Sequence, residues 1–271
     1  FNKIFLNTLK KKLNTFKISS YPNIEKIRNL IAQNLSISNS YICLTSGSDF
    51  GLRMCFEYFF KEKEKIITLN PTFGMVEVYS KLFGLKNIKI NYDEKLNINL
   101  KFLYKNLNNL SKKISMVIIA NPNSPTGSII KPKILLEIIK KTNKLKIPVI
   151  IDEAYYGFYK FSYIKFIKKF DNLVILRTFS KASGLAGLRA GYIVTGKKIS
   201  QNLFKYRPMY EISSIACLAI EYVMKNKSVS RNHISKINLS KKYLSKELTK
   251  MNYNFLNTHG NFFHIDLGGN K

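Results

Sequence analysis

The sequence has little of what several protein classes require. Its 271 residues include no tryptophan and only three cysteines, Cys43, Cys55 and Cys217. Their spacing matches neither a metal site nor a disulfide framework, so we expect reduced thiols in a cytoplasmic protein. No apolar run approaches the ~20 residues of a membrane-spanning helix, and no signal peptide is visible. We therefore expect no membrane partner.

Acidic residues are also scarce. Sixteen Asp and Glu residues stand against 45 Lys and Arg residues, which gives a formal net charge of +29. Such a surplus is compatible with nucleic-acid binding, but nucleic-acid readers rely on arginine forks, and here nearly all of the cations are lysines. We interpret the charge as solvated lysine faces, expect no nucleic-acid partner, and note that the positive field favours phosphorylated substrates.

Apolar runs of strand length alternate with amphipathic stretches of helix length. We expect strands at residues 42–44, 66–69, 116–120, 149–152, 173–177 and 192–194. We expect helices at residues 24–35, 50–60, 74–83, 134–145, 199–206, 213–225 and 234–250. This alternation predicts an α/β fold with a mostly parallel sheet between helices on both faces. Ligands of such sheets bind at the carboxyl ends of the strands.

Three parts follow from this organisation. Residues 1–20 form an N-terminal segment, residues 21–230 a large domain, and residues 231–271 the start of a small C-terminal domain. A turn is expected near residues 228–232, where the chain passes into the small domain.

The segment of residues 180–190 carries the strongest chemical signal. Lys181 follows Thr178 and Ser180 at the end of an expected strand, and Arg189 comes eight residues later, after a run of small residues. A lysine in this place can form a Schiff base with an aldehyde, while the hydroxyls and the arginine hold a phosphate beside it. The alternative is an ordinary surface lysine.

Three further motifs follow other expected strands. Residues 46–49 read Ser-Gly-Ser-Asp before a helix, whose first amides can bind phosphate; the alternative is that Asp49 only caps the helix. Residues 121–127 read Asn-Pro-Asn-Ser-Pro-Thr-Gly, which is at least a turn. Asp152 opens Asp-Glu-Ala-Tyr, where the carboxylate is either functional or a turn cap.

Taken together, these motifs resemble the fold type I aminotransferases that use pyridoxal phosphate, and residues 185–189, Leu-Ala-Gly-Leu-Arg, are similar to the histidinol-phosphate branch. The resemblance implies a mostly parallel sheet of seven-strand type in the large domain and a homodimer. It implies that Lys181 is the catalytic residue, which binds the cofactor covalently and moves a proton. Asp152 would pair with the pyridine nitrogen, and Tyr155 would donate to the ring's phenolic oxygen.

The resemblance also assigns the remaining cofactor contacts. Gly47, Ser48, Asp49, Thr178, Ser180 and Arg189 would form the phosphate cup. Phe73 would stack on the pyridine ring, although it is also compatible with a core aromatic. The family's asparagine before Pro-Thr-Gly is replaced by Ser124, so its contact is longer, bridged by water, or taken over by Asn123. Tyr21, before Pro22, would reach the cofactor phosphate of the other subunit.

The expected activity is transamination between an amino acid and a keto or aldehyde substrate, with histidinol phosphate as the leading substrate. Alternatives are a decarboxylase of a phosphorylated amino acid such as threonine phosphate, or a truncated non-catalytic relative. No residue after Phe262 can supply the family's carboxylate-binding arginine, and the chain starts at Phe1, so we expect a fragment of a longer product. His233, His259 and His264 lack metal-ligand spacing, so no metal is expected, and we place them in loops or on the surface.

Overall fold

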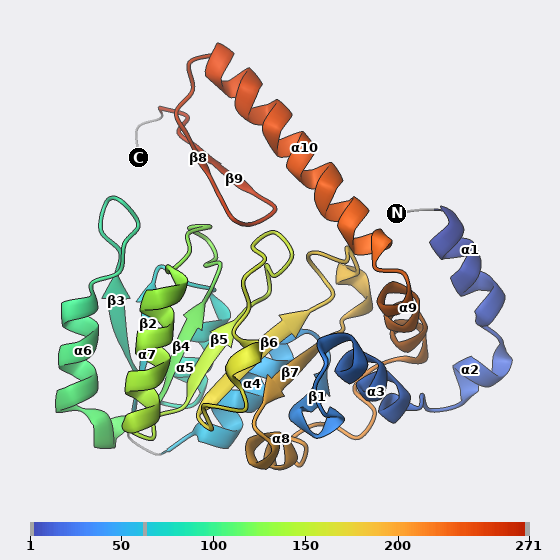
Figure 1. Cartoon of the computed structure of the whole chain (residues 1–271), viewed down its shortest axis with the longest axis horizontal. Helices are drawn as coiled ribbons and strands as arrows, with labels where there is room; N and C mark the ends of the chain where they lie inside the picture. Colours follow the sequence, from blue (N-terminus) through green and yellow to red (C-terminus); the bar gives the residue numbers. More distant parts are fainter. Residues whose placement is uncertain (1–2, 62–63, 269–271) are drawn as a thin grey trace.

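The computed structural model describes residues 3–61 and 64–268. Its centre is a seven-stranded sheet with the strand order β1-β7-β6-β5-β4-β2-β3 (Figure 1). The strands are β1 (Ile42–Thr45), β2 (Lys65–Asn70), β3 (Lys86–Asn91), β4 (Ile114–Ala120), β5 (Val149–Asp152), β6 (Leu173–Thr178) and β7 (Gly191–Thr195). β2 to β6 are parallel, and β7 is antiparallel to its neighbours β6 and β1. The predicted mostly parallel α/β sheet is confirmed.

Helices cover both faces of this sheet. One face packs against α3 (Ile24–Leu35), α6 (Leu100–Asn109), α7 (Pro132–Lys144) and α9 (Ser214–Lys225). The other face packs against α4 (Ser48–Phe59), α5 (Met75–Leu82) and α8 (Lys197–Leu203). Successive strand residues point to opposite faces, so Val149 and Ile151 join the first core and Ile150 joins the second. Burial on both faces explains why the central strands are continuous apolar runs.

The direction of the strands places the sequence motifs at one edge of the sheet. Ala120, Asp152 and Leu176 are neighbours in register on β4, β5 and β6. β1 runs in the same direction as β6, because both are antiparallel to β7. The loops after β1, β2, β4, β5 and β6 therefore leave the sheet at the same edge. These loops contain the motifs singled out in the sequence.

One strand and one α-helix of the large domain were not predicted. Strand β3 reads Lys-Asn-Ile-Lys-Ile-Asn and lies at the edge of the sheet, where only Ile90 is buried. A solvated edge strand needs few apolar residues, so its pattern is weak. Helix α6 is rich in asparagine and lysine and buries only Leu103 and Leu107. These two side chains, four residues apart, lie on one helix face.

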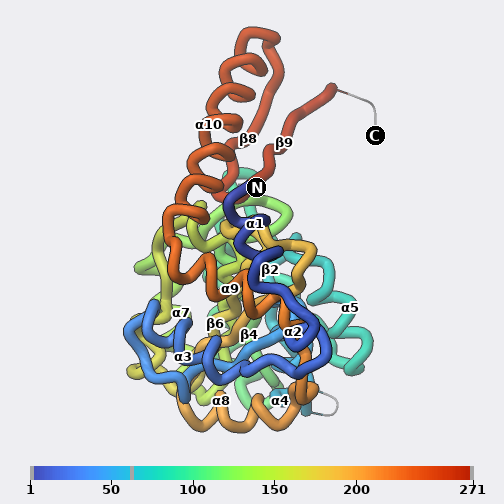
Figure 2. Tube along the Cα trace, turned by 90° about the vertical axis from the view of Figure 1, so that its right-hand side faces the viewer, coloured from blue at the N-terminus to red at the C-terminus, as the bar shows by residue number. Residues whose placement is uncertain are grey.

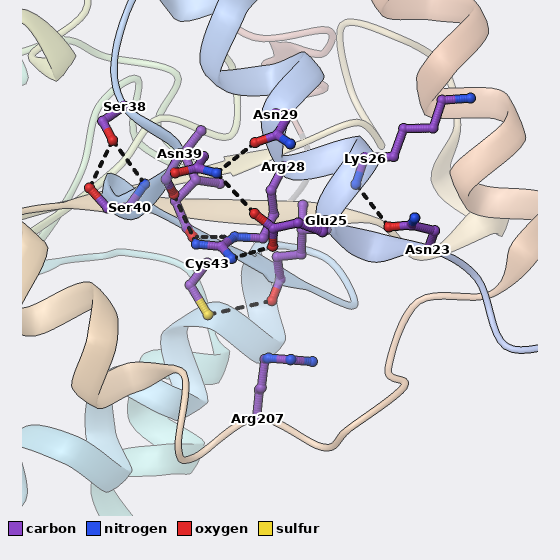
Figure 3. Close-up of polar contacts among 12 residues, drawn as sticks. Asn23, Glu25, Lys26, Arg28, Asn29, Ser38, Asn39, Ser40, Cys43 and Arg207 are labelled. Carbon is purple, nitrogen blue, oxygen red and sulfur yellow. Dashed lines mark hydrogen bonds and ion pairs between the residues drawn. The ribbon is translucent and has the colours of Figure 1, made fainter.

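Polar contacts fix α3 to the start of β1 (Figure 3). Arg28 donates from Nε to the Ile42 carbonyl at 3.1 Å and from Nη2 to the Asn39 carbonyl at 2.9 Å. Its Nη1 also pairs with Glu25 at 2.6 Å. The guanidinium groups of Arg28 and Arg207 both lie against the Phe204 ring, 4.9 Å and 3.7 Å from its centroid. This cluster holds the amino end of β1 in place.

The ends of the chain add elements outside the sheet. α1 (Lys3–Lys12) and α2 (Thr15–Ser19) precede α3, and α1 packs on α9 through an edge-on contact of Phe5 with Tyr222 at 5.1 Å. α10 (Ser228–Lys250) projects from the body, and β8 (Phe255–Asn257) and β9 (Phe263–Ile265) return beside it as a hairpin (Figures 1 and 2). In the described residues no helix is both long and apolar enough to cross a bilayer.

The turn expected at residues 228–232 is wrong, because these residues already belong to α10. The expected helix start at residue 234 is six residues too late for the same reason. The segment is polar, and a helix that buries only Leu248 has no apolar stripe to mark its first turns. The helix continues without a break past residue 230.

Candidate active site at the carboxyl edge of the sheet

A cavity of about 230 Å³ opens at the edge of the sheet where the motif-bearing loops meet. Ten of the predicted site residues line it: Ser48, Asp49, Phe73, Ser124, Asp152, Tyr155, Thr178, Ser180, Lys181 and Arg189. Ala120, Pro122, Ala154 and Ala186 complete the wall and were not predicted. These four are small and apolar, and only their positions could have pointed to them, since Ala120 directly precedes a motif and the other three lie inside motifs.

One side of the cavity is built to receive an anion. The first turn of α4 starts at Ser48, and no side chain caps it. Gly47 before it has a φ of +89°, and a Cβ there would lie 2.9 Å from Nη2 of Arg189. The free amides of a helix start and a guanidinium group thus face the same space. Both attract negative charge.

Hydroxyl groups extend this anion-binding side. Oγ1 of Thr178 donates to Oγ of Ser180 at 2.9 Å, and the Ser180 amide donates back to Thr178 Oγ1 at 3.1 Å. Nη1 of Arg189 lies 3.4 Å from Ser180 Oγ. Arg189 is exposed and forms no ion pair with any described carboxylate, so its charge is available to a ligand.

A glycine of β7 brings the anion-binding groups together. A Cβ at Gly191 would lie 2.6 Å from the Arg177 carbonyl oxygen and 2.8 Å from the Ser48 amide nitrogen. The start of α4 and the end of β6 therefore pack directly on the backbone of β7. Any larger residue would separate them.

Lys181 and Tyr155 form the middle of the cavity. The ammonium of Lys181 lies 5.3 Å from the centroid of the Tyr155 ring. Tyr155 is 7% exposed, so its ring forms a firm wall against which the lysine rests. A cation over an aromatic face is held by the ring quadrupole. Both side chains line the cavity.

Asp152 lies at the bottom of the cavity in an unusual electrostatic position. Burial, together with the nearby charges of Glu153 and Asp49, raises the pKa of its carboxyl to about 7. A hydrogen bond from the Ala154 amide, 2.9 Å long, and the charge of Lys181 act in the opposite direction. A buried carboxylate of this kind is stabilised by a cationic ligand.

A buried ion pair holds the strand ends that carry these groups. Glu153 pairs with Nη2 of Arg177 at 2.7 Å, and Glu153 also accepts from the Tyr163 amide at 2.7 Å. The Arg177 guanidinium stacks on the Tyr156 ring at 3.4 Å. Since Glu153 follows Asp152 and Arg177 precedes Thr178, the pair fixes β5 relative to β6. These contacts give Glu153 a structural role.

Three of the predicted residues do not line the cavity. Gly47 is buried beside Arg189, and its backbone forms the start of α4 on the anion-binding side of the cavity. The side chain of Asn123 is 1% exposed and bonds to Thr72, to the Pro71 carbonyl and to Thr126, which ties its own loop to the loop after β2. It is Ser124 that faces the cavity. Tyr21 is 73% exposed and stacks on Tyr210 with centroids 3.7 Å apart.

The histidines are distributed differently from expectation. His259 is exposed in the turn between β8 and β9, as predicted. His233 lies in α10 and His264 in β9, so a loop placement is wrong for these two, although both side chains stay partly exposed at the surface. Across the described residues no three His, Cys, Asp or Glu side chains gather as metal ligands would.

Comparison with known proteins connects this site to a family. The model of the family "Aminotransferase class I and II" matches residues 6–271. A histidinol-phosphate aminotransferase of Clostridium novyi is 34% identical over 250 residues, which are 92% of this chain and 68% of that protein. The chain thus spans about two thirds of the length of this relative.

Two solved structures show the same fold at lower identity. The structure of histidinol-phosphate aminotransferase from Sinorhizobium meliloti in complex with pyridoxal-5'-phosphate aligns with a TM-score of 0.90 and 20% identity, over 99% of this chain and 73% of that chain. L-threonine-O-3-phosphate decarboxylase from Porphyromonas gingivalis aligns with a TM-score of 0.78 and 18% identity, over 95% of this chain and 76% of that chain.

Proposed function

The chain belongs to the class I and II aminotransferase family, whose members depend on pyridoxal phosphate, and we propose that it transfers an amino group from histidinol phosphate to a keto acid. The observation that carries this proposal is the content of one cavity. It combines a lysine amine, a buried carboxylate and an uncapped helix start with an arginine.

The residues present fit the cofactor. Its phosphate requires amide and guanidinium donors, which the start of α4 and Arg189 supply. Its pyridinium nitrogen requires a carboxylate, and Asp152 is buried with a pKa of about 7 and has no described cation in direct contact. Its aldehyde requires a lysine, and Lys181 lies in the wall of the same cavity.

Each of these residues would have a distinct task. When bound, pyridoxal phosphate supplies an electron sink for the charge left at the substrate's α-carbon. Lys181 would attach the cofactor and, once its Nζ is released by the substrate amine, take the proton from that α-carbon. Asp152 would keep the proton on the ring nitrogen, Tyr155 would donate to the ring oxygen, and Phe73 would cover one ring face.

A phosphorylated amino donor agrees with the charge of the chain. The net charge of +29 creates a positive field that raises the local concentration of anionic substrates. The substrate assignment rests on the relatives, since fold alone does not fix a substrate. The domain division at residue 230 likewise stays a prediction.

We also propose that the active unit is a homodimer in the cytoplasm. The side chain of Tyr21 is exposed and held flat against Tyr210, which presents it to a second copy of the chain. In that dimer Tyr21 would contact the cofactor phosphate of the other subunit. The three cysteines are free and buried, in keeping with a reducing compartment.

The test uses reduction with borohydride in the presence of pyridoxal phosphate. The wild-type protein would gain one cofactor mass on the peptide that contains Lys181 and would show a yellow band before reduction. Lys181→Ala would show neither, whereas Lys197→Ala, at an exposed lysine of α8, would behave as wild type. Absence of the mass on the wild-type peptide would refute the proposed cofactor attachment.

Product analysis separates the two enzyme activities. With an amino acid, a keto acid and cofactor, transamination yields the exchanged pair and no carbon dioxide. The decarboxylase alternative, which one solved structural neighbour represents, releases carbon dioxide without a keto acid. Cofactor attachment without either product would favour the non-catalytic alternative.

A further inference from the structure

The turn between β8 and β9, residues 258–262, rests on the active-site loop of residues 121–127. The His259 amide donates to the Gly127 carbonyl at 2.8 Å, and Nε2 of His264 lies 2.5 Å from the Pro125 carbonyl oxygen. Gly127 has a φ of +66°, and a Cβ there would collide with the Thr258 side chain. The backbones of the two segments are therefore in direct contact.

The same turn also touches the wall of the cavity. The Phe262 ring meets the Tyr155 ring edge-on, with centroids 5.5 Å apart and an interplanar angle of 69°. This is a favourable aromatic geometry. Tyr155 in turn lies under the Lys181 ammonium. The position of residues 258–262 therefore affects Tyr155 and Lys181, the two groups that would contact the cofactor.

One side chain of α10 fixes the conformation of this turn. The Lys241 ammonium donates to the Thr258 carbonyl at 2.5 Å and to the Gly260 carbonyl at 2.8 Å. Within the turn, the Thr258 hydroxyl donates to the Phe262 carbonyl. Partial burial lowers the pKa of Lys241, and the two hydrogen bonds offset part of the cost of removing its ammonium from water. Hydrogen bonds from a charged donor are stronger than neutral ones.

We propose that Lys241 is a positioning residue, which holds the turn of residues 258–262 against the loop of residues 121–127 and thereby fixes Tyr155 beside Lys181. The effect at Tyr155 rests on the proposed function of the cavity. The contact of the turn with the loop does not, because it depends only on the hydrogen bonds and the close approach described above.

The first readout is amide hydrogen exchange of the full chain without cofactor. In Lys241→Met, exchange of the His259 amide would rise about tenfold or more, since the turn loses two charged hydrogen bonds. The amides of β5 would stay protected and serve as an internal reference. Lys241→Arg would keep most of the protection, and Lys242→Met, at the exposed neighbouring lysine, would match wild type.

The second readout is the absorption of bound pyridoxal phosphate as a function of pH. Lys241→Met would shift the titration midpoint of the band and raise KM several-fold more than it lowers kcat, and Lys241→Arg would restore both. Unchanged exchange at His259, or a loss of protection that extends to β5, would overturn the local role of Lys241. Faster exchange with an unchanged band would overturn the link to Tyr155.

Failure of the proposed function gives a different result. In that case the wild-type protein would bind no cofactor, and neither variant would have a band to titrate. The exchange comparison between Lys241→Met and Lys242→Met would still decide whether Lys241 fixes the turn, because it requires no cofactor.

Discussion

The carboxylate of Glu153 and the guanidinium group of Arg177 form an ion pair at 2.7 Å, with side chains only 1% and 6% exposed. The pair lies one residue from Asp152 on β5 and one residue from Thr178 on β6. The strand ends that carry the candidate active-site residues are therefore held by an ion pair as well as by apolar packing. The contribution of this ion pair to stability can be tested separately from cofactor binding.

Glu153→Gln should destabilise the protein by about 3–5 kcal/mol, because it leaves the Arg177 charge buried without its partner. Urea unfolding of the cofactor-free protein measures this loss. The matched control is Glu57→Gln, which breaks the surface pair with Arg53 and should cost about 1 kcal/mol or less. Similar losses of unfolding free energy in the two variants would mean that the buried Glu153 pair contributes no more to stability than the surface pair.

The raised pKa of Asp152 predicts a pH dependence of stability. With a pKa of about 7 in the folded state and an ordinary value near 3.8 when unfolded, the folded protein holds this proton more tightly. The stabilisation is complete below the unfolded value and is lost as the pH rises through the folded one. Between these values wild type should lose about 1.4 kcal/mol per pH unit relative to Asp152→Asn.

Urea unfolding of both proteins without cofactor, from pH 4 to above pH 7, measures this difference. It should level off above the folded pKa of about 7, where Asp152 is ionised in both states. A difference that stays constant over the whole range would show that Asp152 titrates alike in the folded and unfolded chain.

Gly191→Ala should weaken the anion-binding side of the cavity. The new methyl group would meet three main-chain atoms, of Arg177, Gly47 and Ser48, which cannot rotate away. We expect a loss of stability of about 1–3 kcal/mol and reduced cofactor affinity. Gly187→Ala is the control, since a Cβ there would meet nothing within 4 Å. Calorimetric titration with pyridoxal phosphate measures the affinity of each variant. An affinity of Gly191→Ala equal to that of wild type would mean that the methyl group is accommodated without strain.

Arg189→Lys should lower the affinity for pyridoxal phosphate about tenfold or more. Lysine keeps the charge but loses the planar fork that binds two phosphate oxygens at once. Equilibrium dialysis against the cofactor gives the dissociation constants, with Arg231→Lys, at an exposed residue of α10, as the control. Equal affinity of the Arg189→Lys protein and wild type would remove Arg189 from the phosphate cup.

Tyr21→Ala should weaken both the proposed dimer and its cofactor binding. The variant loses a stacked contact with Tyr210, which is of the kind worth about 0.5–1.5 kcal/mol. Sedimentation measures the dimer, and dialysis measures the cofactor. Tyr243→Ala, at a similarly exposed tyrosine of α10, should change neither. A monomeric wild-type protein that binds cofactor fully would contradict the role of Tyr21 across the interface.

Much of the fold was predictable because its central strands are buried on both faces. Ile150, with neighbours Val149 and Ile151, needs apolar partners on each side, so the strand appears in the sequence as an unbroken apolar run. β3 escaped detection since an edge strand with one buried residue lacks this pattern. The first turns of α10 escaped because the helix is mostly solvated.

The sequence by itself determined the motifs and their place in the chain, because the residue types needed after each strand are local and lie within a few positions of one another. Lys181, Asp152 and Ser48 are identified by the sequence alone. Only the tertiary structure decided how buried Asp152 is and that Asn123 bonds to the loop after β2 instead of facing the cavity. The tertiary structure also brings the Phe262 ring against Tyr155 and the Lys241 ammonium to the turn after β8. These relationships depend on how distant segments pack, and the electrostatic cost of burial follows from packing rather than from sequence spacing.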